Sequence, residues 1–278
     1  MSVDYAVHSD FLIHWTGKDL DHQFDDGWDK SDKSTIRRDS DLCHKYLQRL
    51  RSILNYGLWL TEEGESVLPL EERDIPIPST PKVCFTELKL SESRNHARRY
   101  GRLGIGVKRP YLFARLGRPL AYFGFHIAIQ KDPFLRACAK DLKNQQLLNF
   151  FKPMNSSSQT LNYDLYSESE WRILFFQELL DQRLIVDPRD TRNTHENAFF
   201  NSLTVVEQNT LKYLAPLDGW FAMVIYPSLG AKNAAQQEEH FGIREQILRI
   251  KSNLDDHSNR VEGGNWPIEV DLDACRNF

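Results

Sequence analysis

The sequence predicts an α+β fold, with helices packed against a β-sheet. Two patterns lead to this prediction. Short apolar stretches rich in aromatic and β-branched residues recur along the chain and end at polar residues or glycine, as strands do. Between them, apolar residues repeat at three- and four-residue steps, as on amphipathic helices. With 278 residues, 41% of them hydrophobic, the chain can bury a core, which excludes a disordered or fibrous protein.

The first half of the chain is expected to contribute four strands and two helices. The strands are predicted at residues 11–16, 82–86, 105–108 and 119–129, and the last is so apolar that it should be central in the sheet. A helix over residues 42–54 should stop at Gly57, and a second over residues 91–100 should begin at Ser91 as N-cap and end at Gly101. The closely spaced prolines before Pro81 exclude a regular helix or a central strand there.

The second half continues the alternation of helix and strand. Helices are predicted at residues 135–151 and 236–250, strands at residues 170–176 and 220–226, and a polar loop at residues 155–162. Because no repeat or compositional break divides the chain, we expect a single domain, residues 1–278, with an insertion at residues 177–218 and a polar tail at residues 252–278.

Charge is distributed unevenly along the chain. Its 35 Lys and Arg against 39 Asp and Glu give a net charge of -4, which provides no general attraction to nucleic acid or anionic lipid. Between residues 93 and 131, however, there is no acidic residue, and the positive side chains are Arg94, Arg98, Arg99, Arg102, Lys108, Arg109, Arg115, Arg118 and Lys131. This segment could hold a pyrophosphate, a nucleic-acid backbone or an acidic protein. The alternative is a solvated helix face, covered by the acidic loop or flap of residues 19–41.

Cysteine usage indicates a reduced, cytoplasmic protein. Cys43, Cys84, Cys138 and Cys275 lie far apart without a C-x-x-C pair, so neither a zinc site nor a disulfide framework is predicted. The N-terminal segment lacks a secretory pattern, and no apolar run reaches the ~18 residues of a membrane helix. We expect no metal and no membrane association. The phosphate-loop, dinucleotide-fold, zinc-protease and esterase motifs are also absent.

Three places combine polar groups with strand or helix ends. His14 and Thr16 end the first strand and could contact a ribose or phosphate, although most histidines are structural. Ser93 lies at a helix start that could bind an anion or amide, and Phe85 or Tyr100 could stack on a flat ring; the alternative is a plain core strand with a capped helix.

Glu170 heads an apolar strand and is a candidate acid, base or electrostatic stabiliser. Arg172 lies on the same strand face, so the alternative is a simple ion pair between Glu170 and Arg172. Cys84 is expected to be a buried small side chain rather than a nucleophile.

Taken in order, four short motifs resemble the AbiGi family of bacterial abortive phage-infection proteins. They are H-x-T at residues 14–16, C-F-x-E at residues 84–87, Y-G-x-x-G-I at residues 100–105 and E-W-R at residues 170–172. The resemblance covers about residues 10–176, with a weaker match after Trp220. It implies a role in antiphage defence, and proteins of this family are commonly described as antitoxins.

The same order is similar, more distantly, to the ADP-ribosyltransferase fold of the H-Y-E type, which implies a split sheet and NAD as substrate. Carried over, this likeness places His14 on the adenosine ribose, Ser93 near the nicotinamide amide and Glu170 on the nicotinamide ribose, with Thr16, Phe85, Tyr100 and Arg172 completing the pocket. There, Glu170 would stabilise an oxocarbenium-like transition state. Two departures stand out. Cys84 replaces the family's tyrosine, and Trp15, instead of glycine, follows the histidine, where it would crowd the nicotinamide.

Three hypotheses follow. The first is a defence protein that uses Glu170 and His14 to transfer ADP-ribose from NAD to a phage or host macromolecule. The second is a non-catalytic antitoxin that neutralises a partner toxin through the basic segment of residues 94–118. The third is a regulator that binds nucleic acid through that segment, with affinity that falls steeply with salt.

Overall fold

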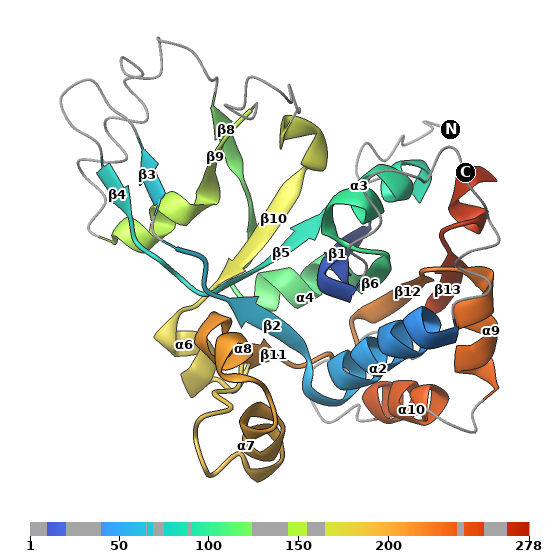
Figure 1. The fold of residues 1–278 in the computed structure, drawn as a ribbon. Coiled ribbons are helices and arrows are strands. Elements are labelled where there is room, and N and C mark those ends of the chain that lie inside the picture. Colours follow the sequence, from blue (N-terminus) through green and yellow to red (C-terminus); the bar gives the residue numbers. More distant parts are fainter. Residues whose placement is uncertain are drawn as a thin grey trace, which may run out of the picture. The chain divides into compact units, whose positions relative to one another are not determined.

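The computed structural model describes residues 10–20, 40–64, 66–68, 75–87, 90–123, 144–154, 165–237, 242–252 and 266–277. Over these residues the chain has a mixed α/β fold, in which parallel and antiparallel strands are flanked by helices (Figure 1). It forms two compact units. Unit 1 comprises Met1–Leu58, Glu87–Tyr111 and Pro216–Phe278, and unit 2 comprises Trp59–Thr86 and Leu112–Ala215. The single domain stays a prediction, and the predicted insertion lies almost wholly in unit 2.

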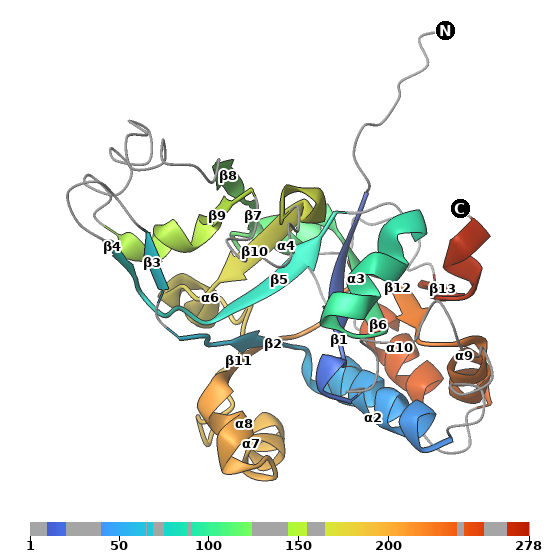
Figure 2. The same cartoon turned by 45° about the horizontal axis from the view of Figure 1, so that its top comes forward.

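Unit 1 is built on four neighbouring strands in the order β1, β6, β12 and β13. β1 pairs antiparallel with β6, β6 with β12 likewise, and β12 pairs parallel with β13. Helix α3 lies on one face of these strands, and α2 and α10 lie on the other (Figure 2). The elements are β1 (Phe11–Thr16), α2 (Ser40–Tyr56), α3 (Ser93–Tyr100), β6 (Leu103–Lys108), β12 (Phe221–Tyr226), α9 (Leu229–Gln236), α10 (Ile243–Ser252) and β13 (Ile268–Asp271).

Unit 2 holds the strands in the order β11, β2, β5, β10 and β7, and two smaller strand pairs. β10 pairs antiparallel with β5 so that Glu170 lies opposite Thr86 and Arg172 opposite Cys84. The strands are β2 (Leu58–Thr61), β3 (Ser66–Leu68), β4 (Ile75–Ile77), β5 (Lys82–Thr86), β7 (Arg118–Pro119), β8 (Ala121–Phe123), β9 (Phe151–Pro153), β10 (Glu170–Leu174) and β11 (Leu211–Ala215). The helices are α6 (Gln177–Asp181), α7 (Thr194–Asn201) and α8 (Val205–Thr210), while α4 (Arg109–Ala114) runs from one unit into the other.

Several predicted elements are confirmed. β1, β5, β6, β10 and β12 lie where strands were expected, and α2 ends at Tyr56, directly before Gly57. Helix α3 ends at Gly101, whose N–H donates to the Ala97 carbonyl. Its start was predicted wrongly, since a 3-10 helix (Leu90–Glu92) precedes it and Glu92, without a side-chain cap, takes the N-cap position.

Other predictions were wrong. Pro119 ends the short strand β7 and residues 121–123 form the short strand β8, with Leu120 between them, so one long strand does not begin here; residues 124–129 lie outside the described part. Where a helix was predicted up to Phe151, Gln145–Phe150 form a 3-10 helix and β9 follows. The predicted polar tail contains β13 and a 3-10 helix, Ala274–Asn277. Residues 21–39 of the acidic segment and the predicted loop at residues 155–162 lie outside the description.

Candidate functional site

The predicted binding and catalytic residues divide between the two units. Unit 1 carries His14, Thr16, Ser93 and Tyr100, and unit 2 carries Phe85, Glu170 and Arg172. Each unit therefore holds one part of the predicted site.

Glu170 is the first residue of β10 and is only 5% exposed. Its Oε1 accepts a hydrogen bond from Arg172 Nε at 2.6 Å, and its Oε2 accepts one from Lys152 Nζ at 2.5 Å. The backbone N–H of Glu170 donates to the Tyr122 hydroxyl at 2.8 Å. The ion pair between Glu170 and Arg172 expected as the structural alternative is thus present, and both carboxylate oxygens are engaged.

A second carboxylate completes this buried cluster. Lys152 Nζ also donates to Glu168 Oε2 at 2.6 Å, and Glu168 is 1% exposed. Arg172 Nη1 donates further to the Asn149 carbonyl oxygen at 2.5 Å. Two anions, Glu168 and Glu170, therefore balance two cations, Lys152 and Arg172, in a neutral group that ties β9 to β10. We call these four residues the charge cluster.

The charge cluster keeps Glu170 ionised. Burial alone would raise the pKa of Glu170, but the positive charges and hydrogen bonds of Arg172 and Lys152 outweigh burial and lower that pKa to about 2. For Lys152, burial would lower the pKa, yet the two carboxylates raise it above its ordinary value. At neutral pH both groups are charged, so Glu170 can act neither as general acid nor as proton carrier.

These shifts predict how stability depends on pH. Because the pKa of Glu170 is lower in the folded chain than its ordinary value of 4.5, its contribution is complete above that value. It is lost as the pH falls from about 4.5 towards about 2, and amounts to ~3 kcal/mol. Urea unfolding at several pH values should show this loss of free energy of unfolding.

A matched control for the pH series is Glu245→Gln, since Glu245 is an exposed carboxylate on α10. This variant should keep the acid-dependent loss of the wild type. An unchanged free energy of unfolding between about pH 5 and about pH 2 would contradict the role given to Glu170.

The neighbours of Glu170 on β5 are packed into the sheet. Phe85 has no exposed surface, which favours a core role over stacking on a ligand ring. Burial of the thiol, and then the Glu170 charge, raise the pKa of Cys84 to about 12. Cys84 is therefore protonated at neutral pH, as expected for a small packing side chain.

In unit 1, His14 and Thr16 lie on the opposite strand face from Ile13 and Trp15. His14 is half-buried and pairs with Ile105 across β1 and β6. The Thr16 hydroxyl accepts a hydrogen bond from Arg49 Nη1 at 3.3 Å. The same guanidinium pairs with Asp19 through Nη2 at 2.6 Å. Arg49 of α2 therefore already contacts the polar rim predicted at the end of β1.

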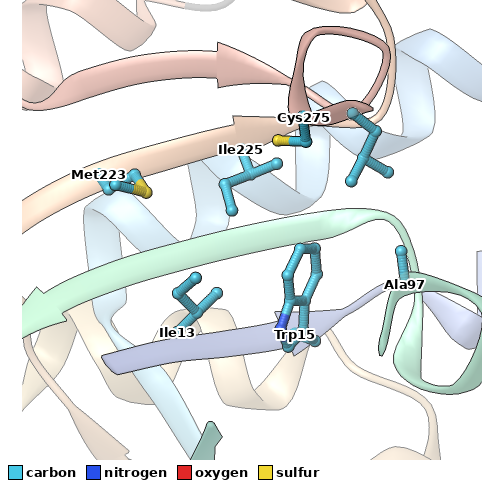
Figure 3. Close-up of a cluster of buried hydrophobic side chains, with 7 residues drawn as sticks. Ile13, Trp15, Ala97, Met223, Ile225 and Cys275 are labelled. Carbon is cyan, nitrogen blue, oxygen red and sulfur yellow. The ribbon is translucent and has the colours of Figure 1, made fainter. Parts of the chain in front are cut away.

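Trp15 packs into a cluster of buried side chains beneath α3. Figure 3 shows its indole between Ile13 and Ala97, with Ile225 and Cys275 above it. Trp15 is 7% exposed, so its side chain fills the core of unit 1. Trp15 therefore has a packing role in unit 1.

The predicted groups on α3 are enclosed to different degrees. Ser93 is fully buried, and its hydroxyl lies beside Cys275, whose pKa is raised to about 11 by burial. Tyr100 is half-buried against the same cluster, with the Arg99 guanidinium carbon 5.5 Å from its ring centroid. The Ser93 hydroxyl is therefore inaccessible to a ligand. One face of the Tyr100 ring is covered by the Arg99 guanidinium, so a ligand could not stack on that face.

The positive segment does not form one solvated face. Arg102 and Arg115 are 6% and 3% exposed, and Arg115 Nε donates to the Leu184 carbonyl oxygen at 3.1 Å. Arg109 forms an ion pair with Glu87. Arg99 and Arg118 are exposed but belong to different units, and Lys131 lies outside the described residues. Of the positive segment's described residues in unit 1, Arg99 is exposed and Arg98 is half-buried, and both lie on the last turn of α3.

Lys152 and Arg49 were not predicted as parts of the site. Each is separated by many residues from its partner, Glu170 or Thr16, so no local spacing could have indicated the contact. Glu168 belongs to the S-E-S-E-W-R run that contains Glu170, but no role was predicted for it. In the described part of the chain, no three His, Cys, Asp or Glu side chains are grouped as a metal site requires.

Comparison with protein-family models, with curated proteins and with solved structures found no match to this chain. Among the helices that the structure describes, none is both long and apolar enough to cross a bilayer.

Proposed function

We propose that this chain acts in abortive phage infection as a non-catalytic antitoxin of the AbiGi type, which neutralises a partner toxin by binding it. The observation that carries the choice between binding and catalysis is the engagement of both Glu170 oxygens inside unit 2. The defence role itself rests on the motif resemblance.

A catalytic carboxylate has to reach the reacting atoms of its substrate. Hydrogen-bond reach requires an approach of about 2.6–3.2 Å between heavy atoms. With 5% exposure and with Lys152 and Arg172 on its two oxygens, Glu170 would have to break a buried ion pair before it met a ribose. Its geometry supports a structural role, which is to tie β9 to β10 through Lys152.

The other predicted pocket residues support the same conclusion. Phe85 and Ser93 are fully enclosed, and Trp15 occupies core volume in unit 1. Packing roles for the side chains that the sequence likeness assigned to an NAD pocket favour a protein that binds a partner over one that cleaves NAD.

The surface we assign to the partner is the end of α3. Arg98 and Arg99 give this turn two positive charges, and Lys18 adds a third cation, since its Nζ donates to the Arg98 carbonyl oxygen at 3.1 Å. Such a turn complements an acidic patch on a protein, and charge complementarity of this kind sets specificity and association rate.

The test is a neutralisation assay. Each gene next to the one encoding this chain is expressed alone and together with the chain, and growth is measured. One neighbour should be toxic alone and harmless with the wild-type chain. Arg98→Glu/Arg99→Glu should abolish the rescue, because two attractions become repulsions. Lys45→Glu/Arg51→Glu, the same charge change at exposed positions of α2, should leave it intact.

Both variants must first show the circular dichroism and melting temperature of the wild type. Full rescue by Arg98→Glu/Arg99→Glu would refute the assigned surface. Absence of any toxic neighbour, together with a measurable activity of the chain alone, would refute the antitoxin function.

The second candidate is an NAD-dependent ADP-ribosyltransferase, and one observation favours it. The pKa of Glu170 is lowered to about 2, so the carboxylate is ionised at neutral pH, as stabilisation of an oxocarbenium-like transition state requires. Calorimetric titration with NAD decides between the candidates. We expect no binding at millimolar NAD; micromolar binding that is lost in a folded His14→Ala variant would establish the transferase instead.

A further inference from the structure

Unit 1 contains a cavity of about 220 Å³ at the C-terminal end of α2, apart from every predicted site residue. Its lining comes from α2, from the segment before β12 and from α10. The lining residues are Leu54, Asn55, Tyr56, Gly57, Pro216, Leu217, Asp218, Arg249 and Ile250. At ~30 Å³ per water molecule, the volume equals about seven waters, which suits one free amino acid rather than a nucleotide.

The helix end supplies hydrogen-bond acceptors. α2 has 17 residues and no basic residue in its last turn, so the partial negative charge of its carbonyl end is not balanced by the helix itself. The carbonyl oxygens of Leu54 and Asn55 accept only long contacts from Arg249 Nη2, at 3.4 and 3.5 Å. These distances are at the limit of a hydrogen bond, and the oxygens can still accept a short one from an ammonium group.

The cavity wall also carries a fixed carboxylate. Asp218 Oδ1 accepts the Trp220 N–H at 2.9 Å. Behind this loop, the buried Lys251 ammonium donates to the carbonyl oxygens of Gly219, at 3.1 Å, and Phe221. Lys251 and Lys108 add positive charge near Asp218, so the surroundings are not purely anionic. The loop is anchored at three points, which holds Asp218 in place before any ligand arrives.

A cation and an apolar surface complete the lining. Arg249 lies on the exposed side of α10, and its guanidinium can pair with a carboxylate. Leu54 and Ile250 are 3% and 7% exposed, and with Leu217 they give the cavity an apolar wall. A carboxylate, a guanidinium and the weakly engaged carbonyls of the α2 end around such a wall match a small molecule with both charges and a hydrocarbon side chain.

We propose that this cavity binds a free aliphatic α-amino acid. Its ammonium group donates to Asp218 and to the carbonyl end of α2, its carboxylate pairs with Arg249, and its side chain packs on Leu54, Leu217 and Ile250. The site is independent of the charge cluster and of α3, so it adds a ligand to the protein whatever its partner is.

Calorimetric titration of the full chain tests the proposal. The probes are L-leucine, L-isoleucine, L-valine and L-methionine, with 4-methylpentanoate as the analogue without an ammonium group and 3-methylbutylamine as the one without a carboxylate. At least one amino acid should bind, and each single-charge analogue should bind at least about tenfold more weakly, because it makes only one of the amino acid's two charged contacts.

Variants locate the ligand in this cavity. Asp218→Asn keeps an acceptor for the Trp220 N–H but removes the charge, and Arg249→Gln removes the cation; each should weaken binding by about tenfold or more. Glu245→Gln, an exposed position of α10 outside the lining, should bind like the wild type. Absence of binding by all four amino acids would overturn the proposal, as would equal binding by the analogues or by folded Asp218→Asn and Arg249→Gln.

Discussion

Glu170→Gln is expected to lower the free energy of unfolding by about 3–5 kcal/mol, the range for breaking a buried ion pair on one side. The glutamine has nearly the same shape but no charge. Lys152 would keep only Glu168 as a partner, and Arg172 would lose its ion pair with Glu170, although both cations are largely buried. Urea unfolding followed by circular dichroism, at neutral pH, measures the loss directly.

A control and a double variant make this result specific. Glu178→Gln removes an exposed carboxylate from α6 of the same unit and should change stability by no more than about 0.5 kcal/mol. Lys152→Gln combined with Glu170→Gln removes one charge of each sign, so the double variant should be less unstable than the two single losses together predict. If Glu170→Gln is as stable as the wild type, the carboxylate is not structural and the transferase becomes the better hypothesis.

The elements that the sequence predicted best are the strands whose apolar runs lie wholly in the core. β12 is buried at all six positions, and β1, β5 and β10 each combine apolar and β-branched or aromatic residues over a short run. Runs of four to six residues are short for a helix, and their β-branched and aromatic side chains favour a strand. Their order along the chain was therefore predictable, although their partners were not.

The errors have identifiable physical causes. Of the helix predicted over residues 236–250, residues 243–250 lie in α10, whereas Gln236 is the last residue of α9 and residues 238–241 lie outside the described part. Gly242, directly before α10, has φ of +59°, a left-handed conformation that glycine adopts easily and that does not belong to a helix. Around the start of β9, Leu148 and Phe151 pack against Ile75 and Phe123. The observed 3-10 helix and short strand bury these side chains as well as the predicted α-helix would. β13 pairs with β12 from a distant part of the chain, and its short run of residues carries no local signal of that partner.

The candidate site was predicted only as far as local geometry allows. Strand alternation places Glu170 and Arg172 on one face, and their ion pair follows from that spacing alone. Lys152 meets them from β9, and Arg49 meets Thr16 from α2, through tertiary packing that no spacing encodes. The sequence thus indicated the ion pair of Glu170 with Arg172 but not the second cation, Lys152.

Gly101→Ala is expected to prevent unit 1 from folding, or to destabilise it by more than about 3 kcal/mol. Gly101 has φ of +111° and ψ of +165°, a region that is essentially restricted to glycine and costs other residues about 1–3 kcal/mol. A methyl group there would also lie 2.3 Å from the Thr16 carbonyl oxygen and 2.4 Å from the Lys18 nitrogen. These are backbone atoms, so β1 itself would have to move.

Expression yield, circular dichroism and the melting temperature measure this effect, and Gly230→Ala is the matched control. Gly230 is exposed in α9 of the same unit, and the nearest atom to an added methyl group is Ser228 Oγ at 3.7 Å. Alanine should be neutral there or stabilising by up to about 1 kcal/mol. Gly101 connects α3, which carries Arg98 and Arg99, to β6. Replacing this glycine should therefore abolish partner binding together with the fold. A Gly101→Ala protein that melts like the wild type would show that the contact between α3 and the end of β1 is looser than these distances require.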